Sequence, residues 1–85
     1  MVTIFVKIQP FTFEQTICVA KDNEIIDSRV VNDVNAVKAV VKDFCMRYHA
    51  QGIKLAGSQD YLSKMVAEMQ NQFGINCPVE IIKGE

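Results

Sequence analysis

The chain has 85 residues, of which 49% are apolar and 22% charged, and its formal net charge is −1. This length suits one small globular domain, residues 1–85, and leaves no room for a second domain. A net charge near zero argues against a dedicated nucleic-acid binder, which usually carries a basic stripe, and against an acidic mimic of nucleic acid. The charges are scattered without a run of one sign, so surface electrostatics indicates no partner.

The lack of a recognisable targeting segment and the pattern of cysteines indicate a reducing compartment. The N-terminus has no basic segment followed by a long apolar core, and no apolar run approaches the ~20 residues that span a bilayer. Cys18, Cys45 and Cys77 lie far apart, and none belongs to a C-x-x-C pair. We expect free thiols that serve as small buried apolar residues, with no metal site. The protein is therefore expected to be soluble and cytoplasmic, without membrane contact.

The first third of the chain predicts an antiparallel meander of three strands, at 2–8, 13–20 and 25–31. Apolar and polar residues alternate along each strand, and Asp22 and Asn23 favour a tight hairpin turn between the second and third strands. One face of the first strand is fully apolar, with Val2, Ile4, Val6 and Ile8. In the third strand, Ile26, Ser28 and Val30 share one face, and Asp27 and Arg29 share the other.

The rest of the chain alternates helices and strands. Asn32-Asp33 is expected to cap a helix whose apolar stripe consists of Val34, Val37, Val41, Phe44 and Tyr48. Gly52 stands where a left-handed residue is expected to end that helix. A short buried strand follows at 53–56. A second helix at 59–73 has the stripe Leu62, Met65, Val66, Met69 and Phe73, and the last strand covers 79–82.

The predicted order is thus β-β-β-α-β-α-β, an α/β fold. Helical crossovers join parallel strands, and they are nearly always right-handed. The simplest arrangement is a five-stranded mixed sheet of order 3-2-1-4-5 with two helices, in which the strand at 53–56 is central.

This order of elements resembles the core of the ribonuclease-H-like fold, which the actin-like ATPases share. The stretch Phe5-Val-Lys-Ile-Gln-Pro-Phe-Thr-Phe, continuing to Val31, is similar to the first hairpin of RuvC-type resolvases. In those proteins the first strand ends in Ile-Asp-Pro-Gly and a small polar turn follows. The stretch Leu55-Ala-Gly-Ser-Gln-Asp60 resembles the strand–glycine–helix turn of the same superfamily. The resemblance covers nearly the whole chain as a pattern of elements.

The departures from that family concern its catalytic groups. The first-strand carboxylate of the family falls at Gln9, and the glycine that follows falls at Phe11. An amide cannot replace a carboxylate that bridges two metal ions. Asp60 could stand near the end of the strand at 53–56, where the family often places a second acid, but one acid does not hold a pair of metal ions. Glu14 and Asp27 have no spacing that brings them to Asp60. The resemblance therefore implies the fold without its nuclease centre, with no catalytic residues and no cofactor. It also disfavours an actin-like ATPase, which needs two such domains.

Three local features suggest sites of other kinds. The Gly57-Ser58 turn could present backbone amides to a phosphate or carboxylate, although an ordinary helix cap explains the same residues. Asp60 in the first helical turn would repel an anion. His49 has no nucleophile or acid beside it, so a surface or capping role is expected. Met46 lies off its helix's apolar stripe and is expected to be exposed.

The second face of the sheet is the remaining feature of interest. If both helices cover the face of Ile4 and Val6, the opposite face is open and resembles a modest interface. If one helix covers each face, Phe5 is buried in a second small core. Sequence alone leaves both arrangements open. The open face would carry Thr3, Phe5, Lys7, Thr16, Cys18, Asp27 and Arg29.

We therefore expect a non-catalytic accessory or inhibitory protein that binds another protein, or a second copy of itself as a homodimer. Its interface candidates are Phe5, Lys7, Arg29 and Met46. The first alternative is a nucleic-acid-binding or nucleic-acid-processing protein of the same fold. The second is a small-ligand or phosphate-binding module at Gly57, Ser58 and Asp60.

Overall fold

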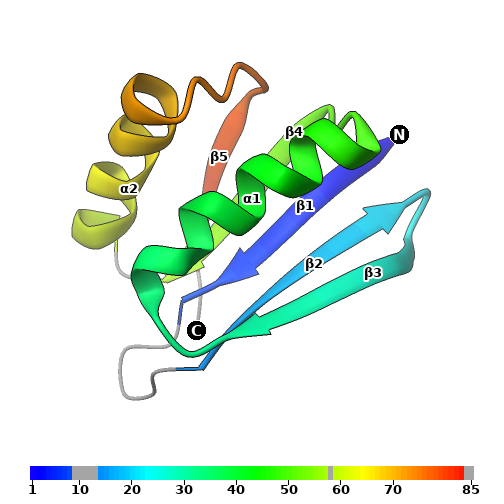
Figure 1. Cartoon of the computed structure of the whole chain (residues 1–85), viewed down its shortest axis with the longest axis horizontal. Coiled ribbons are helices and arrows are strands. Elements are labelled where there is room, and N and C mark those ends of the chain that lie inside the picture. Colours follow the sequence, from blue (N-terminus) through cyan, green and yellow to red (C-terminus); the bar gives the residue numbers. More distant parts are fainter. Residues whose placement is uncertain (9–13, 58, 84–85) are drawn as a thin grey trace.

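The computed structural model describes residues 1–8, 14–57 and 59–83, and it forms one five-stranded mixed sheet with two helices (Figure 1). The elements are β1 (Val2–Lys7), β2 (Gln15–Lys21), β3 (Glu24–Val31), α1 (Val34–Tyr48), β4 (Gly52–Gly57), α2 (Gln59–Gln72) and β5 (Val79–Lys83). The strands lie in the order β3-β2-β1-β4-β5. β1, β4 and β5 are parallel, and β2 is antiparallel to both of its neighbours. The predicted five-stranded mixed sheet of order 3-2-1-4-5 with two helices is confirmed.

The β2–β3 hairpin turns at the two residues predicted for it. Asp22 and Asn23 have φ angles of 52° and 72°, and Lys21 pairs with Glu24 across the turn. Positive φ at both central residues is the requirement of a type I′ turn, whose twist matches that of the flanking strands. Short polar side chains such as these enter the left-handed region at low cost.

The hairpin contains a β-bulge in β3, opposite Ala20 of β2. Ala20 pairs with Ile25 but Val19 pairs with Asp27, so β3 has one more residue than β2 over this interval. A bulge shifts the register by one residue, and each later side chain changes face relative to an unbulged hairpin. Ser28 therefore lies opposite Cys18 and Val30 opposite Thr16, while Asp27 and Arg29 follow the face of the buried core.

Both helices pack on the same face of the sheet, which decides between the two arrangements left open by the sequence (Figure 1). α1 contacts β1, β2 and β3, whereas α2 contacts β4 and β5. The fully buried side chains of this layer are Phe44, Ile4, Ile17, Ile53, Leu55, Leu62, Met69, Val6, Val19, Val37 and Val41. Within the described side chains, the apolar stripes predicted for the two helices face this core.

The ends of the helices show one confirmed prediction and one wrong one. Asp33 caps α1, and its carboxylate accepts a hydrogen bond of 2.9 Å from the amide of Asn35. The left-handed residue at the other end is His49, with φ 54° and ψ 52°, and not Gly52, which begins β4. His49 is an exposed C-cap, in line with the predicted surface or capping role. Gly74, with φ 64°, follows α2.

β4 occupies the centre of the parallel part of the sheet, between β1 and β5. Ile53 and Leu55 are buried beneath the helices. At the end of the strand Gly57 has φ 150°, and a Cβ atom there would lie 3.2 Å from both Cβ and the carbonyl oxygen of Ile8. Ile8 also donates its amide to the carbonyl of Ala56 at 2.8 Å. Gly57 therefore lets the chain leave β4 in close contact with the end of β1.

Candidate functional site: the open face of the sheet

The face of the sheet opposite the helices is not covered by any element in the described ranges (Figure 1). Ile4 and Val6 point into the core, so their β1 neighbours Thr3, Phe5 and Lys7 point the other way. The strand registers extend this face across all five strands. The open face consists of Thr3, Phe5, Lys7, Thr16, Cys18, Ala20, Ile25, Ile26, Ser28, Val30, Lys54, Ala56, Glu80 and Ile82.

The open face collects most of the large apolar side chains that the described part of the protein exposes. Phe5 is 38% exposed, Ile25 65%, Ile26 43% and Val30 54%. Ile25 lies opposite Ala20, and Ile26 precedes Ser28 by two residues, so the bulge puts both isoleucines on this side. Only Met1 and Met46 complete the set of large exposed hydrophobic residues in the described ranges. This concentration distinguishes the open face from the rest of the described surface.

Phe5 lies at the middle of the sheet. Its Cα partners are Cys18 on β2 and Lys54 on β4. The Lys54 ammonium nitrogen lies 5.7 Å from the centroid of the Phe5 ring, within cation–π range. Lys54 in turn lies opposite Glu80 on β5. The face thus has an aromatic centre, an apolar side at β3 and a charged side at β4 and β5.

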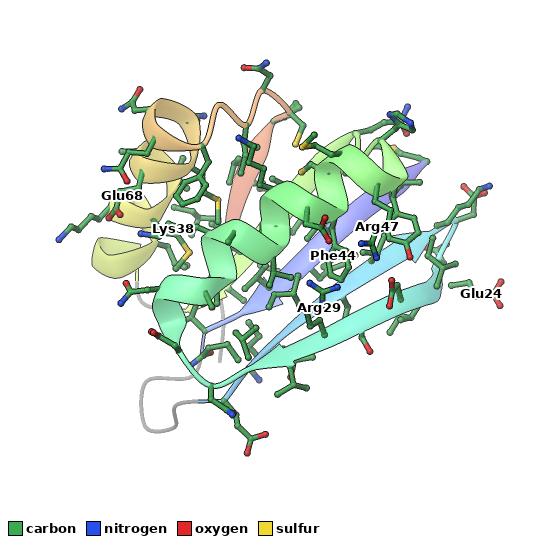
Figure 2. All side chains as sticks on the ribbon, viewed as in Figure 1. Glu24, Arg29, Lys38, Phe44, Arg47 and Glu68 are labelled. Atoms are coloured by element: carbon green, nitrogen blue, oxygen red, sulfur yellow. The ribbon has the colours of Figure 1, made fainter. Side chains whose placement is uncertain are left out.

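The structure corrects the predicted placement of Arg29 and Asp27, which lie on the helix side and not on the open face. Figure 2 shows Arg29 beside Phe44 of α1. The Arg29 guanidinium carbon is 5.3 Å from the centroid of the Phe44 ring, and Nη1 is 3.8 Å from an Asp43 carboxylate oxygen. Asp43 also pairs with Arg47 at 3.2 Å. The predicted orientation is that of an unbulged hairpin, and the bulge reverses it.

Asp27 is held by donors on two elements. The Tyr48 hydroxyl of α1 donates to one carboxylate oxygen, and the Ser28 amide donates to the other at 2.8 Å. The hydrogen bond from Tyr48 is the main reason that the pKa of Asp27 lies below its ordinary value. The same bond raises the pKa of Tyr48. Asp27 therefore ties β3 to the last turn of α1.

The other predicted site residues are not brought together by the fold. Lys7 lies on the open face with Phe5, but Met46 is on α1, which covers the opposite side. Met46 is 68% exposed, as its position off the helical stripe predicted. Of the candidate ligand turn, Gly57 ends β4, Ser58 lies outside the described residues, and Asp60 is described only as part of the α2 backbone.

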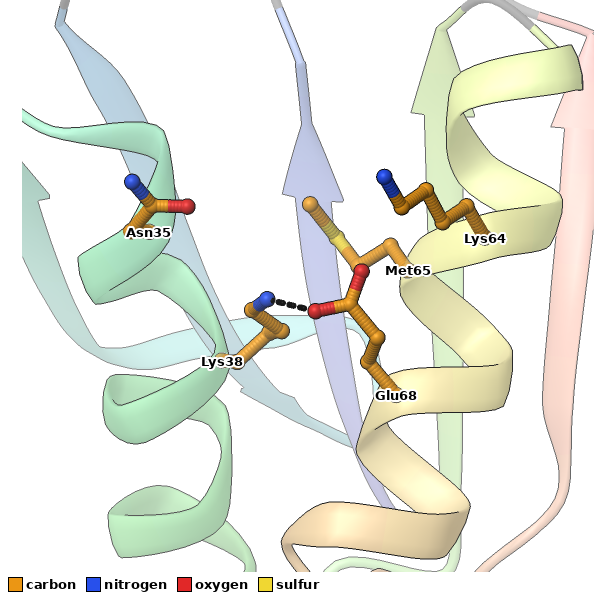
Figure 3. Close-up of a pocket in the computed structure, with 5 residues that line it drawn as sticks. All are labelled: Asn35, Lys38, Lys64, Met65 and Glu68. Atoms are coloured by element: carbon orange, nitrogen blue, oxygen red, sulfur yellow. Dashed lines mark hydrogen bonds and ion pairs between the residues drawn. The ribbon is translucent and has the colours of Figure 1, made fainter.

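A shallow groove of about 200 Å³ lies between the two helices (Figure 3). It is lined by Asn35, Lys38, Lys64, Met65 and Glu68. Lys38 donates to Glu68 across the groove, and this hydrogen bond is the main cause of a lowered pKa at Glu68. The volume is below the ~300–1,000 Å³ typical of small-molecule sites. The ion pair is therefore best understood as a clamp between α1 and α2.

Two cysteines meet in the fold although sequence spacing gave no sign of it. Cys45 in α1 and Cys77 before β5 have sulfur atoms 3.7 Å apart, in hydrogen-bonding contact. Burial, followed by the proximity of Cys77, raises the pKa of the Cys45 thiol to about 12. All three cysteines are free and partly buried. Elsewhere in the described ranges, no three His, Cys, Asp or Glu side chains are grouped so that they could hold a metal ion.

Comparisons with known proteins support the fold and give no function. No family model and no curated protein matches the sequence. The structure is similar to that of the Aquifex aeolicus PPX-GPPA enzyme, with a TM-score of 0.51 and 14% sequence identity. The match covers 98% of this chain and 36% of that one. At such identity the likeness shows the fold alone. No helix in the described ranges has the length and apolar character needed to cross a membrane.

Proposed function

We propose that the protein is a non-catalytic interaction module that binds another protein through the open face of its sheet. The observation that carries the proposal is the gathering of Phe5, Ile25, Ile26 and Val30 on a face that no described element covers. Exposed apolar patches of this kind mark interaction sites. An aromatic side chain at the centre of such a patch is the usual position of a binding hot spot.

The size of the face suits an ordinary protein interface. The two longest dimensions of the molecule are 30 and 26 Å, and the sheet lies across them (Figure 1). A standard interface buries about 800 Å² on each partner, which is an area of similar dimensions. Lys7, Lys54 and Glu80 then form a mixed polar border that excludes no partner by charge.

The test compares variants on the open face with a matched variant elsewhere. Tagged wild-type protein captures the partner from the source cell, and the affinity for the purified partner is then measured by calorimetry. Phe5→Ala is expected to weaken binding about 30-fold, the effect of a hot-spot loss of ~2 kcal/mol. Met46→Ala, which truncates an equally apolar side chain on the helix layer, should leave the affinity unchanged.

Two outcomes would oppose this function. If Phe5→Ala and Val30→Asp both bind like the wild type while remaining folded, the open face is not the interface. If the protein instead binds single strands, duplexes or junctions with an affinity that falls steeply with salt, it belongs to the nucleic-acid-binding class. Thermal unfolding of each variant shows whether the fold is intact.

A further inference from the structure

The exposed edge of β3 offers a second surface, distinct from the open face and independent of the function proposed above. β3 is hydrogen-bonded to β2 on one side, and no element of residues 1–8, 14–57 or 59–83 lies beyond it (Figure 1). Such an edge presents unpaired N–H and C=O groups to any chain that can add a strand. Natural edges are usually protected by proline, by charged side chains (lysine above all), by β-bulges or by a short strand.

β3 has two of these protections, a bulge and charged side chains, and lacks the others. The charges do not exclude a second copy of the chain, because Asp27 and Arg29 have opposite signs. β3 spans Glu24–Val31 and contains neither proline nor lysine, and its bulge lies at the turn end, at Ile25 and Ile26. The opposite edge strand, β5, is shorter and begins directly after Pro78. The edge is therefore regular from 27 to 31, and a second strand can extend it from Ile26, where the bulge ends.

Symmetry and charge select one way for two copies to pair along this edge. In antiparallel pairing about a two-fold axis, opposed residues must share a face if the helices are to stay on one side. Every axis through a residue meets this condition, and the axes through Asp27, Ser28 or Arg29 also keep the pairing well within β3 and clear of a centre in the bulge. The first opposes two Asp27 carboxylates and the third opposes two Arg29 guanidinium groups, and directly opposed like charges are destabilising.

The axis through Ser28 gives a complementary register. Asp27 of each copy then lies opposite Arg29 of the other, so two favourable charge pairs form by symmetry. On the open face, Ile26 lies opposite Val30 of the second copy, which joins the two apolar areas. Asp27 already accepts hydrogen bonds from Tyr48 and Ser28, and a carboxylate has further acceptor sites for a third donor.

We infer that the partner of this edge is a second copy of the chain. Two β3 strands pair antiparallel with the two-fold axis at Ser28, and the two sheets become one continuous sheet. The arrangement leaves both α1 helices on the same side of the joint sheet and keeps Phe5 of each copy on the open face.

Cysteine cross-linking tests the register directly. Ser28→Cys is made in a chain whose native cysteines are replaced by serine, because Cys18 is the Cα partner of Ser28 and would compete. Opposed residues of an antiparallel pair have Cα atoms about 4.5–5.5 Å apart, within disulfide range. Mild oxidation should therefore give a covalent dimer in high yield.

The matched controls are Ile26→Cys and Val30→Cys in the same background. In the Ser28-centred register each of these cysteines lies about 13 Å from its own copy, so neither variant alone should cross-link. An equal mixture of the two should cross-link, because residue 26 opposes residue 30. Cross-linking of Ile26→Cys with Ser28→Cys, or of Ser28→Cys with Val30→Cys, would show a different register and overturn the proposal.

Sedimentation of the unmodified protein supplies the independent measurement. The wild type is expected to dimerise as its concentration rises. Arg29→Asp should weaken dimerisation at least about tenfold, because two attractive pairs become two repulsive ones. The exchange Asp27→Arg with Arg29→Asp should restore it. A wild-type protein that stays monomeric at the highest attainable concentration would refute the inference, whether or not Phe5→Ala affects partner binding.

Discussion

Oxidation of the Cys45–Cys77 pair should cross-link α1 to the segment before β5 and stabilise the fold. The two sulfur atoms are 3.7 Å apart and must approach to about 2.05 Å, which is a small movement for two partly buried side chains. The oxidant is a small-molecule disulfide such as oxidised glutathione. The two protein thiols lose two protons and two electrons, and the glutathione disulfide is reduced to two thiols.

The size of the effect follows from the loop that the new bond closes. The cysteines are 32 positions apart, and the loop-entropy relation gives about 3.7 kcal/mol at 25 °C for a loop of that length. Native-state strain lowers this figure, so we expect about 2–4 kcal/mol. In a domain of this size that corresponds to a rise in melting temperature on the order of 10–25 °C.

The assay is urea unfolding of the oxidised and reduced protein, with peptide mapping to identify the linked residues. Cys77→Ser should abolish the gain, whereas Cys18→Ser should retain it. The rate of formation should increase as the pH rises from 7 to 10, because the pKa of Cys45 is about 12 and the thiolate is the reactive species. An oxidised protein that is no more stable than the reduced one, or a bond that involves Cys18, would refute the reasoning.

Three further predictions concern the fold and its hydrogen bonds. Phe44→Ala removes a fully buried ring and should lower the unfolding free energy in urea by about 3–5 kcal/mol. Gly57→Ala should cost about 1–3 kcal/mol more than Gly74→Ala, because only at Gly57 does the new Cβ meet neighbouring atoms as well as a positive φ; equal costs would contradict the close packing at the end of β4. Tyr48→Phe removes the donor to Asp27, whose depressed pKa contributes stability above its unfolded value near 3.9 that is lost as the pH falls through the folded pKa. The raised pKa of Tyr48 contributes stability below about pH 10 that is lost above its folded pKa. In urea titrations the unfolding free energies of wild type and variant should therefore differ most between about pH 5 and 9. A difference that does not change with pH would exclude a contribution from the Tyr48–Asp27 hydrogen bond through these two pKa values.

The topology was predictable because local signals determine it. Alternating β-branched residues, a two-residue turn at Asp22-Asn23, and helical stripes between parallel strands leave few arrangements that bury every apolar face. The strand order and the burial of Ile53 and Leu55 in a central β4 followed from these signals and were confirmed. The face on which the helices lie did not follow, because both arrangements bury the stripe of α1.

The orientation of β3 was predicted wrongly for a physical reason. A hairpin that starts with Lys21 opposite Glu24 and continues without interruption puts Asp27 opposite Cys18, on the open face. The bulge after Ala20 puts Asp27 opposite Val19 and turns it toward Tyr48. Nothing in the local pattern distinguishes the two registers, since both keep the alternation intact. The tertiary contacts of Asp27 and Arg29 with α1 distinguish them.

The contact between Cys45 and Cys77 could not be predicted from the sequence either. Their separation of 32 positions matches no helical or strand period, and only the packing of β5 beside β4 brings the second cysteine back to α1. The open face is an intermediate case. Its β1 and β2 members, including Phe5 and Lys7, were predicted, whereas its apolar side at β3 depends on the bulge.

The bulge also lets the length of this hairpin vary without turning the strand over. Loss of a single codon at Ile25 or Ile26 would remove the extra residue, and Asp27 would still lie opposite Val19 and face Tyr48. The open face would then carry one isoleucine opposite Ala20 in place of two. Related chains that lack this residue should therefore keep the contacts of Asp27 and Arg29 with α1 and differ in the apolar area that they expose.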